Sequence, residues 1–337
     1  MISTGFGKTN ILPTTIPWME KYRPEKFEDI IMDKRTSAHI NIYLNTNQRC
    51  HLIITGMPGI GKTSTVRCIA RKILGEHFSD GYLELNAAED RGVRSISNII
   101  PPFCKRIVNF TKPRIILLDE ADNMTNKCQC DINDMMKKFG SKALFILTCN
   151  DSTKIIEDVQ SACNILRFQT LTNDQIITYL SGICLKENIK FDKEGMKLIC
   201  YVSCGDMRKA INNLQLTAYS FGSITKNNVL NICKIPDPEN IKEIITMCYS
   251  SNPISDIVKK MNAIIDEGYC YLDIISSFIY VTQETTNILG TELNENIRLE
   301  MIHIMNRCKI DISYGIKSDL QLIAMLARLV KFFKEMN

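Results

Sequence analysis

The sequence has no long hydrophobic run and no apolar N-terminal segment. None of its apolar stretches approaches the roughly 18 residues that a membrane-spanning helix requires. The first residues, MISTGFGKTNILPTT, lack the apolar core of a secretory signal peptide. We therefore expect no membrane partner and a protein that works in the nucleus or the cytoplasm.

Metal-binding cysteine motifs are also absent, although cysteine itself is not scarce. The chain has 14 cysteines, but no two of them show the CxxC spacing of zinc ribbons. In a reducing compartment, such cysteines serve mostly as small buried hydrophobic residues. The sequence therefore gives no support for a zinc site or a disulfide framework.

The chain carries little excess charge of either sign. Its formal net charge is +4, so composition does not indicate nucleic-acid binding, and any basic surface must be local. With 45% hydrophobic and 23% charged residues, the composition is that of a globular protein. A length of 337 residues predicts two or three domains.

Short apolar segments alternate with helical patterns in the first half of the chain. Segments that are apolar nearly throughout fit parallel strands buried on both faces. The candidate strands are HLIITG (51–56), YLELN (82–86), RIILLDE (114–120) and ALFILTCN (143–150). We predict an α/β domain with a parallel sheet over residues 16–169, after a flexible extension of residues 1–15.

Beyond Thr170 the pattern becomes helical. LTNDQIITYLSGICLKENIKF has helical spacing, and the TND at 172–174 is a typical helix start. Two prolines in KIPDPEN (234–240) mark the next break. We predict a small helical domain over residues 170–233 and a helical C-terminal domain over residues 236–337.

The segment GMPGIGKT (56–63) matches the phosphate-binding pattern GxxxxGK[ST] in full. It follows an apolar strand and precedes a helix-compatible run, which is the context that such a loop requires. Its glycines let backbone N–H groups surround phosphates at a helix N-terminus. We expect Lys62 to reach the β and γ phosphates of ATP and Thr63 to hold Mg²⁺. The predicted contacts are Gly56, Met57, Pro58, Gly59, Ile60, Gly61, Lys62, Thr63 and Ser64.

A predicted buried strand that ends in two carboxylates, RIILLDEAD (114–122), supplies the second half of an ATPase site. We expect Asp119 to hold Mg²⁺ through water and Glu120 to orient and deprotonate the attacking water. Such a strand is common by itself and gains its meaning from the phosphate loop upstream. An RNA helicase also carries the letters DEAD, but it needs a second RecA-like domain. The helical sequence beyond Thr170 is too short for one.

With these motifs in hand, the chain resembles the small subunits of replication factor C, the AAA+ clamp loaders. PWMEKYRP (17–24) is similar to the family's N-terminal box, and ELNAAEDRG (84–92) to the box after the second strand. LTCN (147–150) matches sensor 1, and GDMRKAINNLQ (205–215) matches the sensor 2 helix. The segment that ends the core and the collar helices have counterparts in KIIEDVQSACNILRF (154–168), EGYCYLDII (267–275) and KSDLQLIAMLARL (317–329).

The resemblance implies an AAA+ fold, with an α/β P-loop core, a small helical lid domain and an all-α collar domain. Through the collar, five subunits of the family assemble into a hetero-pentamer. The implied partners are therefore the other clamp-loader subunits, a ring-shaped sliding clamp and primer–template DNA. ATP binding would assemble the ring and grip the clamp and the DNA, and hydrolysis would release both.

The resemblance also implies further nucleotide contacts. The N-terminal box packs on the adenine, where Tyr22 offers a flat face, Arg23 follows, and Pro24 fixes the backbone. Asn150, at the end of a strand, can hydrogen-bond the γ-phosphate or the water. Arg208, at a helix start in the small domain, can pair with the γ-phosphate. Each residue also has an interpretation without a nucleotide. Tyr22 could be a core tyrosine, Asn150 a turn-forming asparagine and Arg208 a solvated arginine.

One departure from the family pattern concerns the arginine finger. The family segment SRC reads Ser161-Ala162-Cys163 here. The family donates this arginine to the neighbour's ATP, where it neutralises charge on the transferring phosphate. Arg167 lies nearby, but the family already has an arginine there. We expect the chain to bind ATP without completing its neighbour's site.

A second departure lies in QCDINDMMKK (129–138), where the family usually has AQxALRRxME. The paired arginines, which face the central chamber in the family, become Asn133 and Asp134, and a carboxylate repels phosphate. This weakens the case for DNA contact through this helix. Other candidates for contact with the DNA backbone are four basic residues, with a solvated charged face as the alternative: Arg91, Arg94, Lys105 and Arg106.

Three functions remain open at this point. The favoured one is an ATPase subunit of a hetero-pentameric clamp loader, with Lys62, Glu120, Asn150 and Arg208 as the catalytic residues and a neighbour's arginine finger completing the site. The second is a mainly structural subunit that binds nucleotide with little turnover, which Ala162 favours and Glu120 opposes. The third is an AAA+ remodeller of proteins or DNA junctions that acts as a homo-oligomer, which requires a self-sufficient ring.

Overall fold

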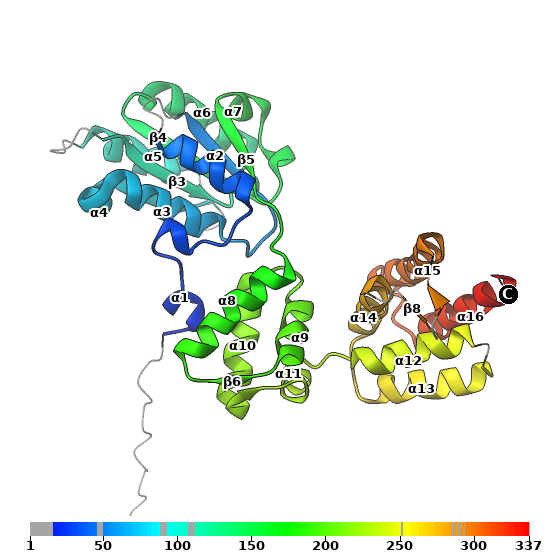
Figure 1. The fold of residues 1–337 in the computed structure, drawn as a ribbon. Helices are drawn as coiled ribbons and strands as arrows, with labels where there is room; N and C mark the ends of the chain where they lie inside the picture. The colour runs from blue at the N-terminus through cyan, green and yellow to red at the C-terminus, as the bar shows by residue number, and fades with distance from the viewer. Residues whose placement is uncertain are drawn as a thin grey trace, which may run out of the picture. The chain divides into compact units, whose positions relative to one another are not determined.

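The computed structural model describes residues 16–45, 50–87, 93–106, 112–250, 252–284, 287–288, 291–292 and 294–336. The chain divides into two compact units, Met1–Thr225 and Lys226–Asn337. Each unit has its own hydrophobic core and is described by itself (Figure 1). Among the described residues, no helix has the length and the apolar character to cross a membrane.

The first unit is built on a five-stranded parallel sheet with the order β2-β3-β4-β1-β5. Its strands are β1 (His51–Thr55), β2 (Tyr82–Asn86), β3 (Arg114–Asp119), β4 (Ala143–Cys149) and β5 (Cys163–Arg167). The four predicted strands are confirmed. β5 was not among them, because this edge strand is exposed or half-buried along its length and lacks a continuous apolar run.

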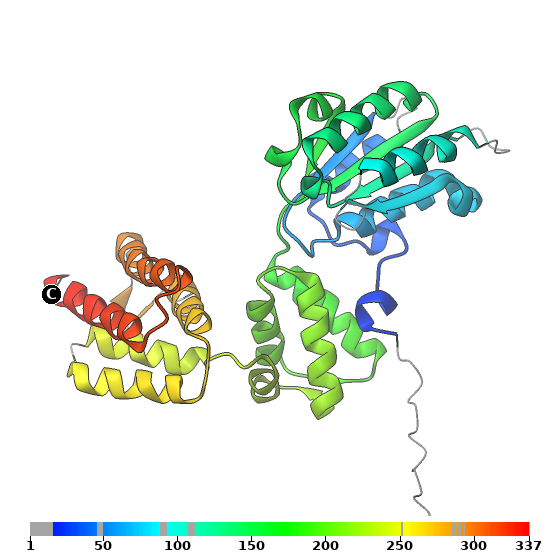
Figure 2. The same cartoon turned by 180° about the vertical axis from the view of Figure 1, so that it is seen from behind.

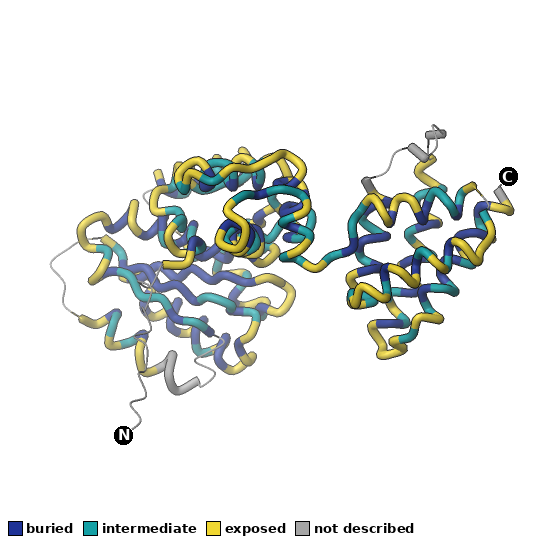
Figure 3. Tube along the Cα trace, turned by 90° about the horizontal axis from the view of Figure 1, so that it is seen from below, coloured by how far each residue is buried: buried dark blue, intermediate teal, exposed yellow. Residues whose placement is uncertain are grey.

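Helices cover both faces of this sheet. They are α2 (Lys34–Asn45), α3 (Lys62–Leu74), α5 (Val93–Lys105), α6 (Asn126–Phe139) and α7 (Glu157–Ser161). Helices α2 and α3 share a buried core with Ile54 and Ile115, whereas α5, α6 and α7 share another with Ile53 and Ile116. Successive strand residues point to opposite faces, so both faces are apolar. Figures 1 and 2 show the sheet from opposite sides, and in Figure 3 its strands are mostly buried.

A helical subdomain follows β5 within the same unit. It consists of α8 (Asn173–Lys186), α9 (Lys193–Ser203), α10 (Met207–Phe221) and the short parallel pair β6 (Lys190–Phe191) and β7 (Ser223–Ile224). Helix α8 begins where the sequence predicts, because Thr172 and Gln175 form a capping box. The short N-terminal helix α1 (Trp18–Lys21) packs on α10, where the backbone N–H of Trp18 donates to Gln215 Oε1 at 3.0 Å.

In the described residues of the second unit, the structure is helical apart from one two-residue pair, β8 (Asn287–Ile288) and β9 (Thr291–Glu292). Its helices are α11 (Lys226–Cys233), α12 (Pro238–Tyr249), α13 (Ile254–Asp266), α14 (Tyr271–Glu284), α15 (Glu295–Ser313) and α16 (Asp319–Met336). Helices α12 to α16 bury one apolar core that includes Ile241, Phe278 and Leu326. The predicted fold class, an α/β P-loop core followed by helical parts, is confirmed.

Candidate nucleotide-binding site

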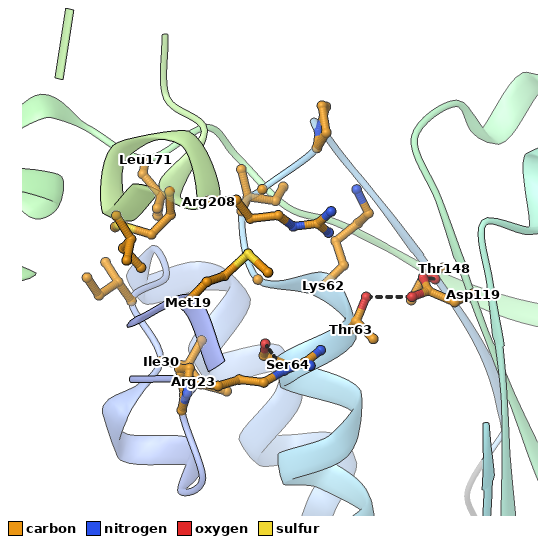
Figure 4. A pocket seen from close by; sticks show the side chains of 18 of the residues that line it. Met19, Arg23, Ile30, Lys62, Thr63, Ser64, Asp119, Thr148, Leu171 and Arg208 are labelled. Atoms are coloured by element: carbon orange, nitrogen blue, oxygen red, sulfur yellow. Dashed lines mark hydrogen bonds between the residues drawn. The ribbon is translucent and has the colours of Figure 1, made fainter. Parts of the chain in front are cut away.

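A cavity of about 360 Å³ lies at the carboxyl ends of β1, β3 and β4 in the first unit. Parallel strands bring the side chains and loops that follow them to one edge of the sheet, which is where α/β proteins bind ligands. The helical subdomain adds Leu171 and Arg208 to the lining, and the N-terminal segment adds Met19 and Arg23 (Figure 4). Three separate parts of the unit therefore form one site.

The cavity gathers most of the residues that the sequence marks as nucleotide contacts. Those lining it are Tyr22, Arg23, Pro24, Pro58, Gly59, Ile60, Gly61, Lys62, Thr63, Ser64, Asp119, Glu120, Asn150 and Arg208. Gly56 and Met57 are not in the lining, but their carbonyls accept hydrogen bonds from Lys62.

The phosphate loop has a backbone that only glycine adopts easily. Gly61 caps α3 in the left-handed region, at φ 91°. Gly59 also has a positive φ of 75°, and a Cβ placed there would lie 1.8 Å from Asp206 Oδ1. The backbone N–H of Met207 donates to the Gly59 carbonyl at 3.2 Å, so α10 begins directly against this loop.

Lys62 is buried at the base of the cavity and fully hydrogen-bonded. Its Nζ donates to Gly56 O at 2.7 Å, Met57 O at 2.9 Å and Asn150 Oδ1 at 2.8 Å. Burial lowers the pKa of Lys62, as does the nearby charge of Arg208, while Asp119 is among the groups that oppose this shift. Three oxygen acceptors thus hold the ammonium group in the cavity. A phosphate oxygen that enters the cavity could replace them as the acceptor.

Thr63 and Asp119 form a compact group of oxygens. Thr63 Oγ1 donates to Asp119 Oδ2 at 2.9 Å (Figure 4). Asp119 Oδ1 accepts from the Thr148 hydroxyl and from the backbone N–H of Glu120 at 3.2 Å. Hydroxyl and carboxylate oxygens are the ligands that Mg²⁺ prefers, so these residues fit the ion.

Glu120 lines the cavity with its backbone in the left-handed region, at φ 55°. This conformation is uncommon for a residue with a side chain and costs on the order of 1 kcal/mol or more. It directs Glu120 away from the path of β3, and its Oε2 accepts from Asn123 Nδ2 at 3.1 Å. The strained residue is the one predicted to activate water.

Arg208 enters the site from the first turn of α10. Asp206 caps this helix, and its Oδ1 accepts from the backbone N–H of Arg208 at 2.9 Å. The Arg208 side chain is exposed and extends toward Lys62 in Figure 4. No carboxylate among the described residues pairs with its guanidinium, which leaves its donors available to an anion.

The N-terminal box connects the helical subdomain to the phosphate-loop helix. The Tyr22 hydroxyl donates to Glu187 Oε1 at 2.6 Å, and the Tyr179 hydroxyl donates to Tyr22 O at 2.5 Å. Arg23 Nε donates to Ser64 Oγ at 3.3 Å. Burial and the bond to Glu187 both raise the pKa of Tyr22.

Several lining residues were not predicted from the sequence. They are Met19, Glu20, Asp29, Ile30, Ile31, Glu84, Asn86, Thr148, Cys149, Leu171, Tyr179, Met207 and Ile211. Glu84 accepts two bonds from Arg67, at 2.8 and 2.7 Å, and one from the Tyr82 hydroxyl at 2.8 Å. The Arg67 pair joins β2 to α3 and has no signature in the sequence.

Of the basic residues considered for DNA contact, Lys105 and Arg106 do not line the cavity. Arg91 and the side chain of Arg94 lie outside the described residues. Lys105 and Arg106 are exposed at the end of α5. Arg106 Nη2 lies 3.7 Å from Asp80 Oδ1.

The two positions of α6 where the resemblance leads one to expect arginines differ in exposure. Asn133 is buried, with 4% of its surface exposed, and its Oδ1 has no hydrogen-bond partner in the described chain. Asp134 is exposed. Ala162, which the sequence resemblance predicts at the finger position, is exposed at the end of α7, and Arg167 is exposed on β5.

Two family models match the chain. Residues 52–171 match the ATPase family associated with various cellular activities (AAA), and residues 236–328 match the replication factor C C-terminal domain.

Full-length relatives match as well. A protein of Acanthamoeba polyphaga mimivirus assigned as a replication factor C small subunit is 58% identical over 95% of this chain and 98% of the relative. Replication factor C subunit 4 of Schizosaccharomyces pombe is 36% identical, over 98% of this chain and 95% of the relative. The small subunit of Methanococcus vannielii is 31% identical, over 93% and 98%.

Among solved structures, the RuvB Holliday junction branch migration motor of Thermotoga maritima has the same fold. The TM-score is 0.54 at 14% identity, covering 83% of this chain and 98% of that one. At this identity the match describes the fold only.

Proposed function

The chain belongs to the family of replication factor C small subunits, and from that premise we propose that it is an ATP-binding subunit of a hetero-pentameric clamp loader. In this proposal the complex opens a ring-shaped sliding clamp and loads it onto primer–template DNA. ATP hydrolysis then triggers release of both. The other loader subunits, the clamp and the DNA are its partners, in the nucleus or the cytoplasm.

One observation carries the proposal for this chain's own site. Lys62 and Asn150 from the core and Arg208 from the helical subdomain converge on a single cavity. Lys62 would bind the β and γ phosphates through the donors that now face backbone carbonyls. Arg208 would pair with the γ-phosphate, so that nucleotide would join α10 to the phosphate loop.

Thr63 and Asp119 would hold Mg²⁺ at the edge of the cavity. When bound there, Mg²⁺ would supply positive charge that offsets the negative charge of the phosphates. Thr148 and the backbone N–H of Glu120 orient the Asp119 carboxylate by donating to its Oδ1. Glu120 would accept the proton of the attacking water.

The proposal assigns an asymmetric role to this subunit in the ring. Its own ATP would receive an arginine finger from a neighbour, because the transferring phosphate needs one more positive charge. The chain would not supply an arginine finger to a neighbour's ATP, since Ala162 has no charged group. It would therefore sit where no neighbour needs its finger or beside a site that is not hydrolysed.

ATP turnover of the purified chain tests this account, for the wild type and Ala162→Arg, with and without primed DNA. We expect a nearly silent wild type and a gain of activity in Ala162→Arg where chains associate. Asn164→Arg, which adds the same charge at an exposed position of β5, should gain nothing. Strong DNA-dependent turnover by the wild type alone would overturn the assignment of Ala162 and the hetero-pentamer argument built on it.

A mainly structural subunit with little turnover is the second candidate, favoured by Ala162 and by the exposed Asp134. Unhydrolysed ATP retained through purification would support it. A homo-oligomeric AAA+ remodeller is the third, and it requires a self-sufficient ring of this chain. Gel filtration of the protein alone distinguishes it from a subunit that depends on partners.

DNA contact in this proposal is made to the backbone and not to base edges. Arg91, Arg94, Lys105 and Arg106 are its candidates. Asn133 is not available for it, because that side chain is buried in α6. Asp134 would repel phosphate.

A further inference from the structure

Asp122 is a carboxylate next to the nucleotide site. It does not line the cavity itself, and the proposed chemistry does not use it. It lies in the short 3-10 helix Ala121–Asn123 that follows β3 and Glu120. Its Oδ2 accepts from the backbone N–H of Asn150 at 3.2 Å. Its Oδ1 is buried and has no hydrogen-bond partner in the described chain. A buried carboxylate oxygen without a partner is costly, so stability alone does not explain this residue.

Asn150 is held at three points, of which Asp122 provides one. The Thr55 hydroxyl donates to the Asn150 carbonyl at 3.3 Å, and Lys62 donates to its Oδ1 at 2.8 Å. Asn150 stands just beyond the end of β4 and is exposed, so no packing fixes it. With its Oδ1 committed to Lys62, the amide retains two N–H donors for a ligand in the cavity.

Asp122 also contributes charge to the same group. It is one of the acidic residues that raise the pKa of Lys62, against the larger effects of burial and of Arg208. Asp119 has a different environment, because its two oxygens are bonded to Thr63 and Thr148. The two aspartates of one short segment therefore have different hydrogen-bond partners, although both raise the pKa of Lys62.

We propose that Asp122 is a positioning residue for the γ-phosphate. By holding the backbone of Asn150, it keeps the side-chain amide bonded to Lys62 and its N–H donors directed into the cavity. Asp122 thereby allows the site to distinguish a nucleoside triphosphate from a diphosphate. This inference rests on the proposed nucleotide site and goes beyond it in assigning the discrimination to Asp122.

Nucleotide binding by the full chain tests the inference without requiring turnover. The dissociation constants of ADP and of ATPγS are measured by calorimetry for the wild type, Asp122→Ala and Asp122→Asn. In Asp122→Ala we expect ATPγS binding to weaken about tenfold, the size of one lost hydrogen bond to a charged group, and ADP binding to change less than about twofold. Asp122→Asn keeps an acceptor oxygen and should remain within about threefold of the wild type.

Two further variants distinguish a loss of Asn150 positioning from a general loss of structure at the site. In an Asn150→Ala background, Asp122→Ala should have no additional effect on ATPγS, since the group that it positions is gone. Asp151→Ala removes a carboxylate one residue beyond Asn150 that accepts from Thr153, and should change neither constant. Equal weakening of both nucleotides, or no weakening of either, would overturn the role of Asp122. A wild type that binds neither nucleotide would instead overturn the proposed function itself, and this inference with it.

Discussion

Lys62 is an ammonium group with only 8% of its surface exposed, and the proposed phosphate contact requires it to stay charged. Three oxygen acceptors compensate the loss of water, and Asp119 and Asp122 oppose the fall of its pKa. The residue is therefore arranged for a phosphate before one arrives. In the proposed function a phosphate oxygen would replace one of these acceptors, and donors that are already positioned in a site stabilise charge better than water does.

Glu120→Gln should separate binding from chemistry at this site. The amide has the size of the carboxylate but cannot accept a proton, so ATP should still bind while turnover falls about 10²- to 10⁴-fold. Turnover is measured with the partner subunits present, and ATP affinity on the chain alone. Glu194→Gln, an exposed change on α9, should leave both values unchanged. Normal turnover in Glu120→Gln would mean that another residue activates the water.

Individual elements around the cavity are joined by pairs of charged side chains. The Arg67–Glu84 pair connects α3 to β2 through two hydrogen bonds, with side chains 33% and 27% exposed. Burial disfavours the charged carboxylate, but the bonds from Arg67 and Tyr82 outweigh it, so the pKa of Glu84 lies below its ordinary value of 4.5. The pair holds the phosphate-loop helix against the sheet.

Arg67→Ala should lower the stability of the first unit by about 1 kcal/mol at pH 7, allowing for partial exposure of the pair. The folded-state pKa of Glu84 is depressed, so its contribution is present above pH 4.5 and is lost as the pH falls through the folded value. The difference in melting temperature from the wild type should therefore shrink in acid.

Arg71→Ala is the matched control for this prediction. It removes the same side chain from the same helix, where the partner Glu25 is 3.7 Å away and 79% exposed. Its effect should stay below about 0.5 kcal/mol. A difference between Arg67→Ala and wild type that grows as the pH falls would contradict the proposed role of the ion pair.

On the scale of the whole molecule, the two units have separate hydrophobic cores. In the second unit α12 to α16 bury residues such as Ile245, Phe278 and Met305 among themselves. A core that is closed within one segment does not need the other unit in order to form. The segment that matches the replication factor C C-terminal domain is thus built on a core of its own.

The fragment 226–337 should therefore fold alone. We expect a cooperative thermal transition followed by circular dichroism, because a segment of this size with one closed core exceeds the marginal limit for independent folding. Phe278→Ala, which deletes a fully buried ring, should lower its stability by about 3 kcal/mol or more. A broad, uncooperative transition in the wild-type fragment would show that this core depends on the rest of the chain.

The sequence by itself determined the features that lie within one short stretch of chain. The phosphate loop at 56–63, the four buried strands and the helix start at Thr172 are local patterns, because glycine freedom, continuous hydrophobicity and capping act between near neighbours. The fold class and the family followed from these patterns. The edge strand β5 was not predicted, because a strand with one exposed side lacks a continuous run of hydrophobic residues.

Only the tertiary structure decided which distant residues meet at the cavity. Asp122 reaches the backbone of Asn150 because β3 and β4 are neighbours in the sheet, and Arg67 reaches Glu84 because α3 packs on the sheet that contains β2. The burial of Asn133 is also a result of tertiary packing, since its exposure depends on what packs against α6. These contacts depend on how elements pair and pack in space. Local sequence patterns do not specify which elements become neighbours.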